Sequence, residues 1–220
     1  MARVRGNVGT SLRSSDAVSA FGKKSAAAGD YGEKKLDRAL ETSRKTGGYH
    51  RWRSLKIPPS ASGKRYRSDV DFALANGDTI VLIDAKCWSG GFLWSLSGSV
   101  MDGFRRKKNF HGEEQSVGRN MAMAVDLYQQ HCDKLHKNRL QRGVKSRRVK
   151  VIGLVIFVPT QRGVMPTSVR FLKFPGTKGT YLVDPGVRAV AKCLGRTKYD
   201  NNGELIVNPI SVSLLDKYTR

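Results

Sequence analysis

The stretch that decides the fold is SDVDFALANGDTIVLIDAKCW, residues 68–88. It contains two runs rich in apolar and β-branched residues, separated by Asn76-Gly77. An Asn-Gly pair between two such runs is a strong signal for a tight β-hairpin. The pattern therefore predicts two antiparallel strands, and the second strand ends in two charged residues, Asp84 and Lys86.

Acidic residues gather at the open end of this predicted hairpin. Side chains alternate between the faces of a strand, so Asp69 and Asp71 share one face of the first strand, as Asp84 and Lys86 do on the second. A two-residue Asn76-Gly77 turn would place Asp84 opposite Asp69. Neighbouring carboxylates repel one another unless a cation lies between them, and their oxygens suit Mg²⁺ or Mn²⁺. We therefore expect a metal site here.

Around the hairpin, helical and strand patterns alternate. A helix is expected from Asp30, ended by Gly47-Gly48, and a second over about residues 113–137. The apolar run VKVIGLVIFVP, residues 149–159, predicts a strand buried on both faces. A strand (TYLVD), a short helix (GVRAVAKCLG) and a C-terminal segment follow. These elements predict an α/β protein with a central mixed β-sheet flanked by helices.

The charge balance points to a polyanionic partner. Forty Lys and Arg residues stand against eighteen Asp and Glu, for a formal net charge of +22. Nucleic acid is the commonest such partner. A membrane is disfavoured, because the chain has no apolar run of about 18 residues. Residues 1–29 predict a flexible basic N-terminal arm without a secretory signal, before one domain over residues 30–220.

The motifs also resemble a known family. Asp71, followed thirteen residues later by Asp84-Ala85-Lys86, is similar to the PD-(D/E)xK nuclease signature. The ordered set of motifs looks most like its nuclease-related (NERD) branch, over roughly residues 30–160. Besides the Asp71 and Asp84 strands, the set comprises Gly32-Glu33, Trp88 with Gly90, Gln115, and the apolar strand 151–158.

The resemblance implies a restriction-endonuclease-like core and a role for each motif residue. Lys86 would act on the attacking water, and Gln115 would help to position that water or the phosphate. The implied ligands of Mg²⁺ (or Mn²⁺) are Asp71, Asp84, Glu33 and the Ala85 carbonyl, with Asp69 as an accessory. The chain departs from the family pattern in having Asp84 where Glu is usual and Phe72 where His is frequent.

Three of these assignments keep an alternative. Glu33 lies three residues after Asp30, a spacing that also fits a helix capping box. Gln115 is accounted for equally well as a residue at a helix start. Ideal hairpin pairing favours Asp69 as the partner of Asp84, whereas the family spacing favours Asp71, and a bulge near the site would decide for Asp71.

Basic stretches supply the expected nucleic-acid surface. The residues assigned to it are Arg51, Arg53, Lys64, Arg65, Arg67, Arg105, Arg106, Lys107, Lys108, Arg147 and Arg148. The predicted function is that of a Mg²⁺-dependent endo- or exodeoxyribonuclease in the cytoplasm of a bacterial or phage-infected cell. RNA is a second candidate polymer, and a homodimer would suit double-strand cutting. The alternative is a non-catalytic nucleic-acid-binding protein on a nuclease scaffold, a component of DNA packaging, of a virion or of a nucleoid.

Overall fold

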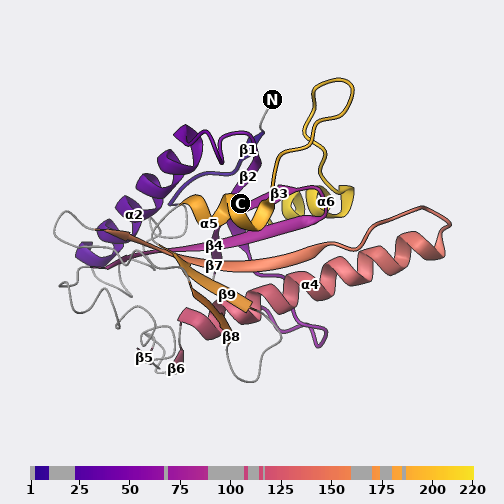
Figure 1. The fold of residues 1–220 in the computed structure, drawn as a ribbon. Coiled ribbons are helices and arrows are strands. Elements are labelled where there is room, and N and C mark those ends of the chain that lie inside the picture. Colours follow the sequence, from indigo (N-terminus) through magenta and orange to yellow (C-terminus); the bar gives the residue numbers. More distant parts are fainter. Residues whose placement is uncertain are drawn as a thin grey trace.

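The fold comes from a computed structural model that describes residues 3–9, 23–66, 69–88, 107–108, 114–115, 117–159, 170–173, 180–184 and 187–220. Within these ranges a mixed sheet runs in the order β1-β2-β3-β4-β7-β9-β8 (Figure 1). Its strands are β1 Val4–Arg5, β2 His50–Lys56, β3 Asp69–Asn76, β4 Thr79–Trp88, β7 Lys150–Pro159, β8 Arg170–Lys173 and β9 Thr180–Asp184. The helices are α2 Lys23–Thr42, α4 Val117–Gln141, α5 Val187–Leu194 and α6 Pro209–Tyr218.

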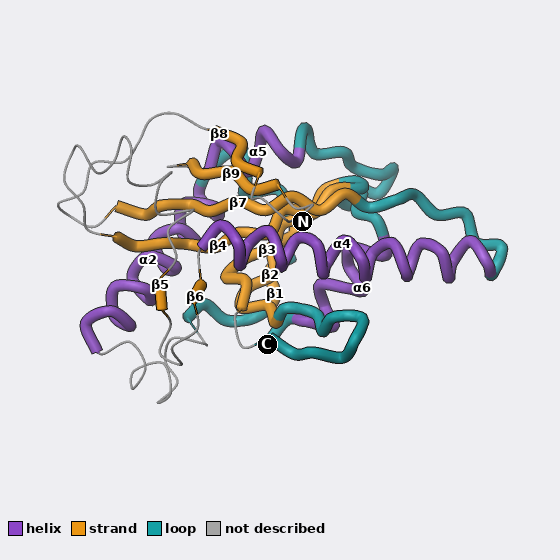
Figure 2. The backbone as a smooth tube through the Cα atoms, turned by 90° about the horizontal axis from the view of Figure 1, so that it is seen from below, coloured by secondary structure: helices purple, strands orange, loops and turns teal. Residues whose placement is uncertain are grey.

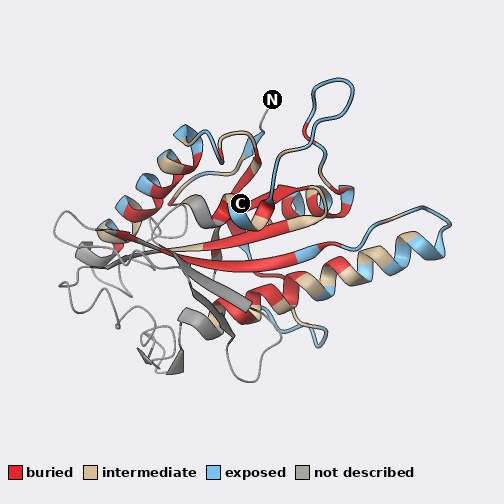
Figure 3. Ribbon diagram, in the orientation of Figure 1, coloured by how far each residue is buried: buried red, intermediate tan, exposed pale blue. Residues whose placement is uncertain are grey.

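Helices cover both faces of the sheet (Figures 1 and 2). On one face, α2 and α5 bury Leu36, Leu40 and Val190 against Phe72 and Ile83 of the sheet. The other face packs α4 and α6 against a second apolar cluster. The central strands are buried on both sides (Figure 3). The predicted α/β class, with a mixed sheet flanked by helices, is therefore confirmed.

The hairpin forms as predicted, but its turn lies one residue further along. Asn76 pairs with Thr79, so the loop residues are Gly77 and Asp78 instead of Asn76 and Gly77. Gly77 adopts a left-handed φ of 51°, which glycine tolerates. Asn76 stays in the strand because its side-chain amide donates to the carbonyls of Leu194 and Arg196. The pairing of β3 with β4 is therefore shifted along the strands relative to the predicted pairing.

Two helix starts also differ from expectation. Helix α2 begins at Lys23 instead of Asp30, within an alanine-rich stretch that favours helix and buries Ala26. Helix α4 begins at Val117. The preceding residues form a short strand, β6 (Glu114–Gln115), which pairs with β5 (Lys107–Lys108). These corrections to the predicted helix starts matter for the site, because a residue assigned to the site lies near each predicted start.

Residues 3–9 lie against the sheet, although they fall within the segment expected to be a flexible arm. Strand β1 pairs in parallel with β2. At Gly6 the backbone has a left-handed φ of 77°, and a Cβ there would lie 2.5 Å from the Arg53 carbonyl oxygen. The Ser54 hydroxyl donates to the Asn7 carbonyl. This close packing fixes the start of the described chain beside β2.

The apolar run at 149–159 forms the predicted central strand. Strand β7 lies between β4 and β9, parallel to both, and its described side chains are buried from Val151 to Ile156. Gly153 lets α4 approach, because a Cβ there would lie 2.7 Å from the Met121 Cγ. No helix in the described parts of the chain is long and apolar enough to cross a membrane.

Candidate active site

The shifted register brings Asp71, and not Asp69, beside Asp84. The printed β3–β4 ladder ends at Phe72 paired with Ile83, and one further step places Asp71 opposite Asp84. The Asp71 carboxylate reaches β4, where its Oδ2 accepts a hydrogen bond from the Ala85 backbone N–H at 2.6 Å. Ile83 and Ala85 pack on the α2 face, so alternation places Asp84 on the α4 face. Both carboxylates are half-buried.

An irregular backbone lies across from Asp71 on the next strand. The β2–β3 register places Ser54 opposite Asp71, and Ser54 has a left-handed φ of 51°. For a residue other than glycine this conformation is uncommon and costs roughly 1–3 kcal/mol. The cluster pattern changes here as well, because Val70 and Ala73 pack on the α4 face and Phe72 between them packs on the α2 face. Such deviations occur preferentially at functional sites.

Asp69 is held by the C-terminal residue of the chain. Its Oδ1 lies 3.0 Å from the Nη2 of Arg220, and its backbone pairs with Lys56 of β2. Burial raises the pKa of the Asp69 carboxyl above its ordinary value, and the positive charges of Arg220 and Lys56 oppose that rise. Asp69 therefore has a charged partner within the chain, on the side of β3 away from β4.

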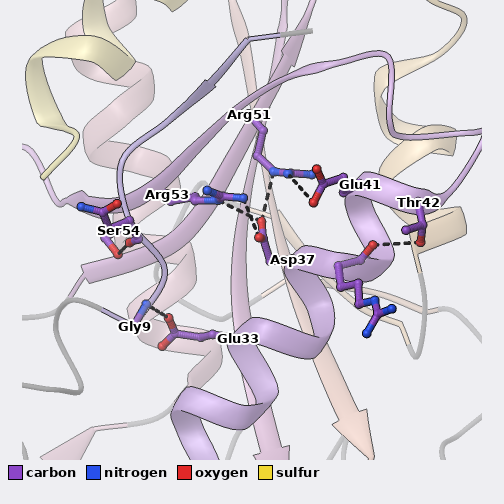
Figure 4. A network of polar contacts seen from close by, with 10 residues as sticks. Gly9, Glu33, Asp37, Glu41, Thr42, Arg51, Arg53 and Ser54 are labelled. Atoms are coloured by element: carbon purple, nitrogen blue, oxygen red, sulfur yellow. Dashed lines mark hydrogen bonds and ion pairs between the residues drawn. The ribbon is translucent and has the colours of Figure 1, made fainter.

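Glu33 lies in the middle of α2, so helix capping does not explain it. The helix begins ten residues earlier, and the Asp30 carboxylate pairs with Lys34 at 2.6 Å. The Glu33 side chain is buried, with 4% of its surface exposed, and its Oε2 accepts a hydrogen bond from the Gly9 backbone N–H at 2.9 Å (Figure 4). The N-terminal residues thus hold this carboxylate directly.

One helical turn from Glu33, an ion network fastens α2 to β2 (Figure 4). Arg53 donates to both oxygens of Asp37, at 3.0 and 2.6 Å, and the Arg51 Nε lies 3.1 Å from Asp37 Oδ1. Arg51 also lies 3.8 Å from Glu41. Arg51 is buried, which contradicts its predicted contact with phosphate, whereas Arg53 is half-buried and bonded to Asp37, and its predicted contact stays a prediction.

This network was missed from the sequence, although its signal was present. Glu33, Asp37 and Glu41 follow one another at intervals of four, which aligns them on one helix face. Arg51 and Arg53 alternate on one strand and so share a face. An acidic stripe and a basic pair of this kind indicate that a helix and a strand pack together.

Two predicted site residues are described only through their backbone. Lys86 lies in β4, two residues beyond Asp84, and pairs with Phe157 of β7. Gln115 lies in β6 and not at the start of α4, so the prediction that it opens a helix is wrong. Over the ranges that the structure covers, no three His, Cys, Asp or Glu residues form a group that could hold a metal ion.

The nine predicted nucleic-acid contacts other than Arg51 and Arg53 divide into three groups. Lys64, Arg65, Arg147 and Arg148 are exposed. Arg67, Arg105 and Arg106 lie outside the described residues. Lys107 and Lys108 form β5, whose side chains also lie outside the description. The loop that carries Lys64 and Arg65 is fastened to α4 by His131, whose Nε2 lies 3.0 Å from the Pro59 carbonyl oxygen.

The fold and this strand-end pair define a class: an α/β protein with a nuclease-like core. A family model for the nuclease-related domain (NERD) matches residues 28–158, which is more than half of the chain. The chain belongs to this nuclease-related family. Comparisons with curated proteins and with solved structures give no match.

Proposed function

We propose that the chain is a divalent-metal-dependent nuclease that hydrolyses phosphodiester bonds in DNA. The observation that carries the proposal is the Asp71–Asp84 pair at the open end of the β3–β4 hairpin, within a domain of the nuclease-related family. The net charge of +22 supports a polyanionic substrate. A protein that only bound a polyanion would have no need of clustered carboxylates, so this pair on so basic a chain supports catalysis.

The oxygen ligands suit Mg²⁺ or Mn²⁺. Asp71, Asp84 and the Ala85 carbonyl would hold the ion. Glu33 lies in α2, on the other face of the sheet from Asp84, and accepts a hydrogen bond from the Gly9 N–H, so it is not part of this ligand set. A bound ion would supply charge stabilisation at the phosphate and a more acidic water. The Ala85 N–H donates to Asp71 Oδ2 and so orients the Asp71 carboxylate toward β4. Lys86, two residues past Asp84, would orient the attacking water and offset charge on the phosphate.

The proposal is tested by a DNA cleavage assay, with DNA binding measured as the control. Wild type and the variants Asp84→Asn and Lys86→Ala are incubated with plasmid, linear and single-stranded DNA in Mg²⁺, Mn²⁺ or EDTA. We expect the wild type to cut only with metal, and both variants to bind DNA without cutting it. A wild type that binds DNA but does not cut in any metal would make the chain a non-catalytic binder. Asp84→Asn cutting as well as wild type would overturn the site.

A further inference from the structure

Helix α4 extends well beyond the sheet that it covers. It crosses β7 at Gly153, where Met121 and Val125 make close contact. From Val125 the helix continues to Gln141, which at 1.5 Å per residue is about 24 Å. Figures 1 and 2 show this end of the helix, and the loop that returns to β7, reaching past the ends of the strands. We call residues 134–150 the basic spur.

The basic spur carries a high density of positive charge. Eight of its residues are basic and none is acidic: Lys134, Lys137, Arg139, Arg142, Lys145, Arg147, Arg148 and Lys150. Arg148 pairs with Asp133 at 2.9 Å, and Arg147 lies 3.7 Å from Asp78. The other six make no ion pair with any residue that the structure describes. The spur is largely exposed (Figure 3).

The spur lies at the end of the sheet opposite to the carboxylate pair. Lys150 pairs with Thr79 at the start of β4, whereas Asp84 pairs with Val155, five steps further along. At about 3.3 Å per step the separation along the strands is about 17 Å, and Figure 1 shows the spur reaching beyond the start of β7. Because a duplex rises about 3.4 Å per base pair, this distance corresponds to about five base pairs or more.

We propose that the basic spur is a second nucleic-acid contact, which binds the phosphate backbone of duplex DNA five or more base pairs from the phosphodiester bond positioned at Asp71 and Asp84. The choice of DNA as the partner rests on the proposed function. A rigid helix with exposed cations suits a stiff, densely charged polymer better than a flexible one. Affinity should therefore depend on duplex length, since a duplex of about 8 base pairs centred on the carboxylates extends only about four base pairs toward the spur.

The experiment compares two variants with equal loss of charge. The spur variant replaces by Gln four exposed residues that have no ion pair with any described part of the chain: Lys134, Lys137, Arg142 and Lys145. The matched control replaces four exposed basic residues on or beside α2 and α5, on the opposite face: Arg38, Lys192, Arg196 and Lys198. Thermal unfolding establishes that both variants are folded. Binding is measured in EDTA, so that turnover does not interfere.

Fluorescence anisotropy follows binding to duplexes of about 40 and about 8 base pairs over a range of salt concentrations. We expect wild type and control to prefer the long duplex, and the spur variant to lose that preference. Each lost phosphate contact should lower the slope of log affinity against log salt by about 0.9, so four contacts lower it by about 3.6.

Equal losses in the two variants, or a wild type that binds neither duplex, would overturn the inference. So would tighter binding to anionic phospholipid vesicles than to DNA through the same four residues. A cleavage assay separates this inference from the proposed function. Spur-dependent binding without cutting contradicts only the nuclease activity, and cutting with unchanged binding by the spur variant contradicts only the spur.

Discussion

The carboxylate of Asp71 accepts a hydrogen bond from the backbone N–H of Ala85, with 2.6 Å between the two atoms. This contact joins the first hairpin strand to the second at the point where the ladder ends. It directs Asp71 toward β4, while Asp69 is directed to Arg220. Two acidic residues separated by a single valine therefore have different surroundings, and their substitution should have different consequences.

The first prediction compares Asp71→Asn with Asp69→Asn. An Asn side chain can still accept the Ala85 N–H, so Asp71→Asn keeps the strand contact and removes only the charge. Loss of an outer partner of a metal ligand already costs about 10–100-fold, so we expect metal-dependent cleavage to fall by about 100-fold or more. Asp69→Asn should cut like wild type. Initial rates on supercoiled plasmid measure both, and a reversed order would make Asp69 the primary ligand.

The second prediction concerns the N-terminal residues that hold Glu33. A Cβ at Gly6 would meet the Arg53 carbonyl oxygen at 2.5 Å, whereas a Cβ at Gly63 would meet nothing within 4 Å, although both glycines have a left-handed φ. Gly6→Ala should therefore destabilise the protein by about 1–3 kcal/mol more than Gly63→Ala. Urea unfolding measures the difference. Exchange of the Gly9 amide should become faster in Gly6→Ala alone, because its bond to Glu33 depends on this packing.

The hairpin could be predicted from sequence because its signals are local. The apolar runs and the Asn76-Gly77 pair lie within a few residues of one another, and both strands formed. The register could not be predicted, since it depends on whether Asn76 belongs to the strand or to the turn. That choice is made by the carbonyls of Leu194 and Arg196, which lie 118 and 120 residues away.

Long-range contacts account for the other errors at the site. Whether Glu33 caps a helix depends on where α2 begins, and that is decided by burial of residues such as Ala26. Asp69 is diverted by Arg220, 151 residues further along the chain. Arg51 was assigned to the surface because it lies in a basic stretch, and only the position of α2 makes it a buried partner of Asp37.

The third prediction tests Arg51 as a structural residue. Its side chain is 4% exposed and lies between Asp37 and Glu41. Removal of one partner from a buried ion pair costs about 3–5 kcal/mol, and since Asp37 keeps Arg53 we expect the lower end, about 3 kcal/mol, for Arg51→Gln. Lys64→Gln, at an exposed residue, should change the free energy of unfolding by less than about 0.5 kcal/mol. Urea denaturation gives both values.

The effects of Arg51→Gln and Lys64→Gln on DNA affinity should follow the opposite order to their effects on stability. Arg51 is buried and offers no phosphate contact, so the folded fraction of Arg51→Gln should bind DNA as wild type does. Lys64 is exposed, and its loss should weaken binding and lower the salt dependence. If Arg51→Gln were fully stable and bound DNA poorly, its assignment to the helix–strand network would be wrong.

The last prediction is a pH dependence at the base of the spur. Arg148 donates two hydrogen bonds to Asp133, both at 2.9 Å, and this contact holds the pKa of the Asp133 carboxyl below its ordinary value. A carboxyl whose pKa is lower in the folded state stabilises the fold above its unfolded pKa, and this contribution disappears as the pH falls through the folded pKa.

Asp133→Asn should thus be less stable than wild type at pH 7, by under about 1 kcal/mol because the pair is exposed. At a pH below the folded pKa the two proteins should unfold at the same temperature. A difference between Asp133→Asn and wild type that persists unchanged in acid would mean that packing, and not the charge of Asp133, fastens the start of β7 to α4.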